Sequence, residues 1–235
     1  MIMKKGCFIL IIAFMSMQMS YAQSFSKDEL KKYSGQGKKT DEARAAELAK
    51  ENPLNDQYEL VLSCVKEYPG QSKFELYNKI HNWIISLSSN PQSAIQVADT
   101  TKWIIQTRCN IQQIAKRTMG DNRYKVDIRP LLTFDFKDDK VRFTYTLQSY
   151  DVLKKTDDVG GVFMMGNIGF FDGGGQKIDN QVWPLSECYP FAKKPSHPKV
   201  TSSRALVNSV AVYKILVDRV DGVLNKKETN KNNDW

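Results

Sequence analysis

The stretch that most constrains the fold is residues 125–153, which read as a long β-hairpin with a two-residue turn at residues 138–139. A turn of that length places Phe136 opposite Val141 and puts most large side chains on one side of the hairpin. The other side carries charged residues, threonines and a glutamine, as on a solvated sheet face. The hairpin therefore predicts an antiparallel sheet. Its apolar positions are Val126, Ile128, Pro130, Leu132, Phe134, Phe136, Val141, Phe143, Tyr145 and Leu147.

The beginning of the chain has the pattern of a signal peptide. Residues 1–22 contain Lys4 and Lys5, then an apolar run, then the small-x-small sequence that ends at Ala22. We expect cleavage before Gln23 and export to the periplasm or the medium. No later segment approaches 18 apolar residues, so we expect no transmembrane segment in the mature chain.

The chain is basic, and the most obvious basic residues are scattered. The formal charge of +8 includes Lys4 and Lys5, and no acidic residue precedes Ala22, so cleavage leaves +6. Basic residues occur at 31–39, 193–199 and 226–231. Scattered charge favours solubility or weak attraction to anionic envelope surfaces, and export also argues against nucleic acid as a partner.

Three cysteines follow the signal peptide, namely Cys64, Cys109 and Cys188. An odd number allows one disulfide at most, and we favour small buried thiols over a disulfide. Neither a metal nor another cofactor is expected, because there is no C-x-x-C and the only histidines are His81 and His197.

The first half of the chain predicts alternating element types. Residues 23–56 are polar, contain an Ala-rich helix at 41–52, and are expected to form a leader or linker outside the core. A strand at 58–68 and a hairpin within 94–111 flank a helix that begins with the capping box Ser72-x-x-Glu75. The apolar stripe of that helix is Phe74, Tyr77, Ile80, Ile84 and Leu87.

The second half predicts a long insertion and a closing helix. Residues 155–200 are Gly- and Pro-rich and are expected to be irregular. A helix at 202–224, within a segment 201–225, has an apolar seam that should cover the sheet beside the first helix. Residues 226–235 read as a disordered tail. We therefore expect an α+β core at 57–154 with about five strands, in the order β-α-β-β-β-β-α, and two helices packed on one face.

Three motifs carry a family resemblance. ELYNKIHNWI at 75–84, IQVADTTKWIIQ at 95–106 and LTFDFKDDKVRFTYT at 132–146 resemble a secreted bacterial domain of unknown function, common in Bacteroidota, with a TATA-binding-protein-like (TBP-like) fold. The resemblance covers residues 58–153. It implies a curved antiparallel sheet with two helices on one face, and it supplies no activity. The family often has Lys-Asp-Gly-Arg at the central turn, whereas residues 137–140 are Lys-Asp-Asp-Lys, which leaves room for a longer or bulged turn.

No pattern of catalytic residues stands out. There is no G-x-S-x-G, no H-E-x-x-H and no phosphate-binding loop, and His81 and His197 are expected to have structural or solvent-facing roles. Paired aspartates at 138–139 and 157–158 are typical of turns. We therefore expect a protein that is not an enzyme.

Two surfaces are candidates for binding. One is an apolar cluster in the Gly-rich segment, which would act as a flap for a ligand or partner, or would instead fold back on its own sheet. The other is the polar sheet face, where arginines would suit an anionic group although such faces are usually just solvated. The candidate residues are Phe163, Met164, Met165, Ile168, Phe170, Phe171, Arg108, Arg129 and Arg142.

These observations predict an exported, non-catalytic binding module whose partner is an unknown protein of the bacterial cell envelope. The alternative is a carrier of a small hydrophobic ligand, with residues 159–175 as a lid. An enzyme of unrecognised type comes third.

Overall fold

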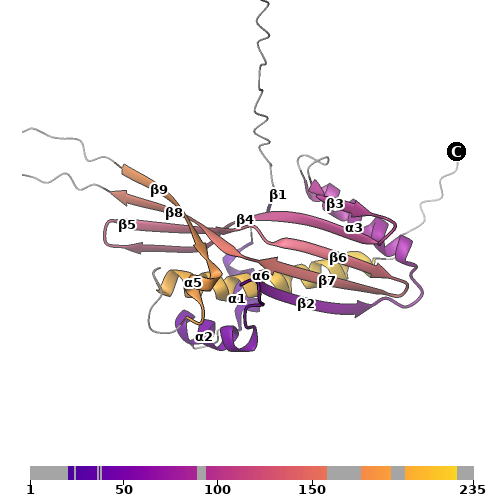
Figure 1. Ribbon diagram of the computed structural model, residues 1–235, viewed down its shortest axis with the longest axis horizontal. Helices are drawn as coiled ribbons and strands as arrows, with labels where there is room; N and C mark the ends of the chain where they lie inside the picture. The colour runs from indigo at the N-terminus through magenta and orange to yellow at the C-terminus, as the bar shows by residue number, and fades with distance from the viewer. Residues whose placement is uncertain are drawn as a thin grey trace, which may run out of the picture.

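The strand β4 (Ile104–Met119) forms the axis of the sheet. The computed structural model describes residues 21–23, 25–35, 37, 39–88, 94–157, 176–191 and 199–226 (Figure 1). After a reversal at Gly120, where φ is 56°, β5 (Asn122–Ile128) and then β6 (Leu131–Lys137) run antiparallel to β4. β7 (Lys140–Leu147) pairs with β6, and β8 (Ser149–Asp157) pairs with β5.

Four further strands complete the sheet. β2 (Leu60–Glu67) pairs with β7, and β9 (Gln176–Pro184) pairs with β8. β3 (Val97–Asp99) and β1 (Tyr21–Gln23) both pair with β4, β1 in the parallel sense. Cleavage before Gln23 would leave only that residue of β1.

The described part of the sheet is nine-stranded, so the expectation of about five strands is wrong, although the α+β class is right. Pro130 has no amide hydrogen to donate, and it separates β5 from β6, which the sequence pattern presents as one long strand of the hairpin. Likewise Gln148 separates β7 from β8. Each of these shorter strands therefore has its own pair of neighbouring strands.

The central hairpin has the expected register. Phe136 lies opposite Val141, and Lys137 lies opposite Lys140, so the two-residue turn is retained. Asp139 takes a φ of 63°, which aspartate tolerates better than most residues. Its Oδ1 accepts a hydrogen bond from the Gly70 amide at 2.7 Å, and this contact explains an aspartate at a position that favours glycine.

Two helices cover one face of the sheet, as expected (Figure 1). α3 (Lys73–Leu87) begins at the predicted capping box, and α6 (Lys199–Leu224) is the predicted closing helix. One residue of the predicted α3 stripe is misplaced, because Phe74 is 60% exposed, whereas Leu76, which widens the predicted stripe, is buried.

The first two helices form a layer behind α6, which corrects the expectation that residues 23–56 lie outside the core. α1 (Lys27–Ser34) and α2 (Asp41–Glu51) both pack on α6. Leu30, Ala45 and Leu48 are buried there. The polar composition of this segment describes only its outer side, while small alanines on the inner side allow a close approach to α6. As a result α6 is buried on most of its sides.

The expectation that residues 155–200 are irregular is also partly wrong. β8 continues to Asp157, β9 pairs with it from Gln176, and Trp183 is buried. α5 (Leu185–Cys188) follows β9. The Gly-rich segment at 158–175 and residues 192–198, including His197, lie outside the described residues.

Cys64, Cys109, Cys188 and His81 lie within the described residues. Cys109 and Cys188 are buried free thiols, and Cys64 is a half-buried one. His81 stacks on Tyr77, with ring centroids 5.9 Å apart. Of the helices within the described ranges, none is long and apolar enough to span a bilayer.

Candidate functional site

The face of the sheet opposite α3 and α6, called the outer face below, carries polar side chains because residues alternate along each strand. Ser63 and Thr144 share a hydrogen bond of 3.2 Å between their hydroxyl oxygens. Gln106 donates to the Thr133 hydroxyl at 3.4 Å. These contacts link β2 to β7 and β4 to β6, and Thr133 lies opposite Thr144 in the β6–β7 pair, so the four strands present one polar surface. Val61 and Val65 are exposed at its β2 edge.

Two of the predicted arginines are held by aspartates on this face. Arg142 lies opposite Asp135, with 3.0 Å between Nε and Oδ2. Arg129 contacts both carboxylate oxygens of Asp151, at 2.7 and 3.0 Å. The hydrogen bond that each arginine donates to its aspartate raises the pKa of that arginine above its ordinary value. Both guanidinium groups are therefore oriented, and their charges are largely balanced.

Arg108 differs from the other two arginines. Its guanidinium donates to the backbone carbonyl of Arg129 at 3.3 Å, and it forms no ion pair with any residue that the structure describes. This contact brings Arg108 and Arg129 together at the break between β5 and β6. Arg142 lies apart from them, since Arg108 aligns with Leu131 and Arg142 aligns with Asp135. Of the three predicted arginines, Arg108 is thus the one best placed to meet an anionic group.

A shallow groove of about 400 Å³ lies beside Arg129. Asp127 lies in the groove, and its Oδ1 accepts a hydrogen bond of 2.6 Å from the backbone amide of Gln113. The lining offers carboxylates, a guanidinium and side-chain amides, which can orient a polar ligand but supply no hydroxyl, thiol or imidazole. Its residues are Asn110, Asp127, Arg129, Asp151, Val152, Leu153, Asn180, Gln181 and Val182.

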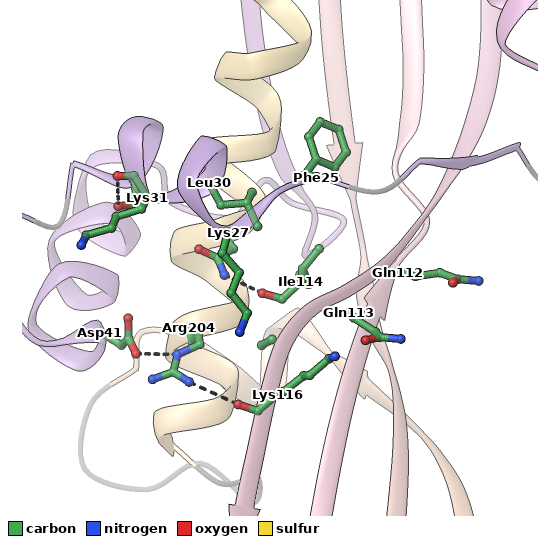
Figure 2. Close-up of a pocket in the computed structure, with 13 residues that line it drawn as sticks. Phe25, Lys27, Leu30, Lys31, Asp41, Gln112, Gln113, Ile114, Lys116 and Arg204 are labelled. Atoms are coloured by element: carbon green, nitrogen blue, oxygen red, sulfur yellow. Dashed lines mark hydrogen bonds and ion pairs between the residues drawn. The ribbon is translucent and has the colours of Figure 1, made fainter.

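A second cavity, of about 630 Å³, lies between α1, α6 and β4 (Figure 2). The register of β4 shifts between Ile111 and Ala115, and Gln113 has a φ of 55°. At this bulge and just after it, two side chains of α6 donate hydrogen bonds to carbonyls of β4. Asn208 donates to the carbonyl of Ile114, and Arg204 donates to the carbonyl of Lys116 at 3.2 Å.

The cavity has an apolar floor and a cationic rim. Phe25, Leu30 and Ile114 are apolar, and the Lys27 side chain extends between α1 and β4 (Figure 2). Arg204 is already engaged, because its Nε lies 2.8 Å from Asp41 Oδ2. The chemistry suits a small amphipathic anion.

The sequence analysis missed this second cavity, because three distant segments build it. The one local signal is the loss of two-residue alternation at residues 111–115.

The remaining predicted residues cannot be placed. Phe163, Met164, Met165, Ile168, Phe170 and Phe171 lie outside the described residues. The residues that flank this segment, Asp157 and Gln176, form the last pair of the β8–β9 ladder. Within the described part of the chain, no group of three or more His, Cys, Asp or Glu residues could hold a metal ion.

A comparison with family models identifies a described fold type for part of this chain. Residues 63–151 match the family described as "Domain of unknown function (DUF4468) with TBP-like fold", which confirms the resemblance drawn from the sequence. No curated protein matches the chain.

Two solved structures are similar to this chain. A TBP-like protein from Parabacteroides distasonis has a TM-score of 0.48 and 12% identity, over 75% of this chain and 99% of that one. A DUF4468 family protein from Bacteroides ovatus has a TM-score of 0.47 and 13% identity, over 76% of this chain and 92% of that one.

Proposed function

We propose that this chain, whose residues 63–151 match the DUF4468 family, is a non-catalytic protein-binding module of the bacterial cell envelope, exported by residues 1–22. The observation that carries the proposal is the outer face of β2, β7, β6 and β4. The hydrophobic core lies on the other face, under α3 and α6. No described helix covers the outer face.

The chemistry of the outer face supports a protein partner. Hydroxyl and amide groups are linked by hydrogen bonds across the strands, and Arg142 is held by Asp135, so little side-chain freedom remains to be lost on binding. Exposed Val61 and Val65 add apolar contact area at the edge. Arginine next to apolar surface is typical of protein interfaces. The partner should present a carboxylate to Arg108.

Capture from native envelope extract tests this proposal. The mature chain, residues 23–235, is the bait beside Arg108→Glu, and the charge-matched Lys50→Glu on exposed α2 is the control. We expect Arg108→Glu to reduce the captured partner at least tenfold while its melting temperature stays within about 2 °C of the parent. Equal capture by Arg108→Glu and the parent would exclude the outer face as the binding surface.

The envelope location has its own measurement. Expressed with residues 1–22 in its native type of host, the chain should be recovered from the envelope or medium with Gln23 as its first residue, as read by mass spectrometry. Recovery in the cytoplasm with the first 22 residues intact would contradict export.

A second candidate is a carrier of a small hydrophobic or amphipathic ligand, which the cavity between α1 and β4 favours. Native mass spectrometry of the mature chain should then show a bound small molecule that is lost in Leu30→Glu. A protein free of bound molecules from its native host would contradict this candidate. The role of residues 159–175 as a lid stays a prediction.

A further inference from the structure

The ends of four strands form an arm that extends past α2 and α5 (Figure 1). We define the arm as residues 116–125 of β4, β5 and their turn, 153–157 of β8 and 176–180 of β9. It combines seven basic residues with three acidic ones. The basic residues are Lys116, Arg117, Arg123, Lys125, Lys154, Lys155 and Lys177, and the acidic ones are Asp121, Asp157 and Asp179.

Strand pairing places like charges next to one another on this arm. Lys116 lies directly opposite Lys125, and Arg123 lies directly opposite Lys155. Like charges in direct opposition destabilise a sheet. Among the described residues, only Arg123 of the seven cations forms an ion pair, with Asp157. Lys154 also has an acidic neighbour, because it lies opposite Asp179. The like-charge pairs do not stabilise the arm, and its excess positive charge favours anions from outside the chain.

The charges also lie on both faces of the arm. Lys116 and Lys125 share the outer face with Arg123 and Lys155, because all four stand at alternate positions in paired strands. Lys154 lies opposite the buried Tyr124 and so belongs to the other face. A protein that docks on one side would meet only part of this charge. A layer of anionic groups that surrounds the arm would meet all of it.

The sequence that joins the ends of β8 and β9 adds a second signal. Asp157 and Gln176 close the ladder, and from Val159 to Phe171 the chain carries no charged residue. This stretch contains three phenylalanines and two methionines. An apolar sequence attached to a cationic element is the combination that gives stable binding to an anionic lipid surface, because either signal alone is weak.

We propose that the arm binds the anionic headgroups of a lipid membrane. The site consists of the seven described cations, whose side-chain nitrogens meet headgroup phosphates. This inference does not rest on the protein-binding role of the outer face, because it uses other residues at the far end of the sheet. It makes the arm the part of the chain that would hold the module at a membrane surface.

Vesicle flotation tests this proposal. The mature chain is mixed with vesicles of phosphatidylcholine alone, or with about 30% phosphatidylglycerol, at low and at high NaCl. We expect binding to the anionic vesicles only, with loss of binding at high salt because exposed charges are screened. The triple variant Lys116→Gln, Lys125→Gln, Lys155→Gln should bind at least tenfold less, since each basic residue near the surface adds to the attraction.

The matched control is Lys31→Gln, Lys50→Gln, Lys214→Gln, which removes the same net charge from exposed positions outside the arm. This control should keep at least half of the parent's vesicle binding. The arm variant should melt at the same temperature as the parent or higher, because it removes like-charge pairs, so weaker binding cannot be attributed to unfolding.

Three results would overturn the proposal. They are equal binding by the arm variant and the parent, equal losses in both triple variants, and equal binding to neutral vesicles. Arm-dependent capture of an acidic protein or a nucleic acid, without vesicle binding, would also overturn it. Partner capture through Arg108 is measured separately, so failure of one proposal leaves the other standing.

Discussion

Two buried serines of α6 differ in whether their hydroxyl groups form a hydrogen bond. Ser203 and Ser209 are both fully buried on α6. Ser209 Oγ donates to the Ala205 carbonyl at 2.7 Å, whereas Ser203 Oγ has no hydrogen-bond partner within the described structure. An unsatisfied buried hydroxyl is costly, while a satisfied one is close to neutral.

Ser203→Ala should therefore stabilise the protein by about 1 kcal/mol, because it removes an unpaired polar group and improves helix propensity. Urea unfolding of the mature chain measures this change in the free energy of unfolding. Ser209→Ala is the matched control, and it should gain less, since it loses a hydrogen bond. Equal gains in both variants would show that helix propensity alone is responsible.

The thiols should differ in reactivity. Burial raises the pKa of both Cys109 and Cys188 to about 12, whereas Cys64 is only half-buried. The thiolate is the reactive form, so a thiol reagent at pH 8 should label Cys64 first in the native mature chain. Cys109 and Cys188 should react only after denaturant is added. Rapid labelling of Cys109 or Cys188 in the native protein, located by peptide mass spectrometry, would contradict this expectation.

Among the elements, α6 holds the layers together. One side of it packs on the sheet, where Tyr213 stacks on Phe143 with ring centroids 5.8 Å apart. Another side packs on α1 and α2, and Arg219 contacts Glu29 at 2.8 Å. A helix between two layers is apolar around most of its circumference. The helices before β2 are consequently part of the cooperative unit.

Leu48→Ala in α2 should destabilise the protein by about 2–5 kcal/mol, the usual cost of truncating a buried leucine. Chemical denaturation gives this difference in the free energy of unfolding. The control is Lys50→Ala on the exposed side of the same helix, which should stay within about 0.5 kcal/mol of the parent. A Leu48→Ala variant as stable as the Lys50→Ala variant would restore the interpretation of residues 23–56 as a linker.

At the level of the molecule, the hydrophobic core and the proposed protein-binding surface lie on opposite faces of one sheet. The inner face and the helices α1, α2, α3, α5 and α6 hold the core, including buried thiols and phenols that ionise only at alkaline pH. The outer face and the arm hold the oriented arginines and the unpaired cations. Changes in charge on the outer face or the arm should therefore alter binding with little effect on folding.

The free energy of unfolding should fall as the pH rises from about 9 to 12. Burial raises the pKa of Cys109 and Cys188 from 9.0 to about 12 and raises the pKa of Tyr145 and Tyr150 above 10.0. The folded state thus keeps protons that the unfolded state releases in this range, so rising pH favours unfolding. Denaturant titrations at pH 8, 9, 10 and 11 measure the slope, and a flat profile would contradict the burial of these groups.

Local patterns in the sequence were enough to predict several of the elements. Two-residue alternation predicts the Phe136–Val141 register, the Ser72 capping box predicts the start of α3, and steps of three and four predict α6. Each pattern acts over a few residues along the chain. The sequence also predicted the polar face with Arg108, Arg129 and Arg142, because strand parity assigns a face without any knowledge of neighbours.

Which elements pack against one another became clear from the folded chain alone. Residues 23–56 have the composition of a linker, but their alanines pack against α6 in the folded chain. The break at Pro130 gives β5 and β6 different strand partners. Lys116, Lys125 and Lys155 are scattered along the sequence and lie on one face of the arm only because their strands pair. Strand pairing and helix packing depend on surfaces that form only in the folded chain, so a local sequence pattern does not predict them.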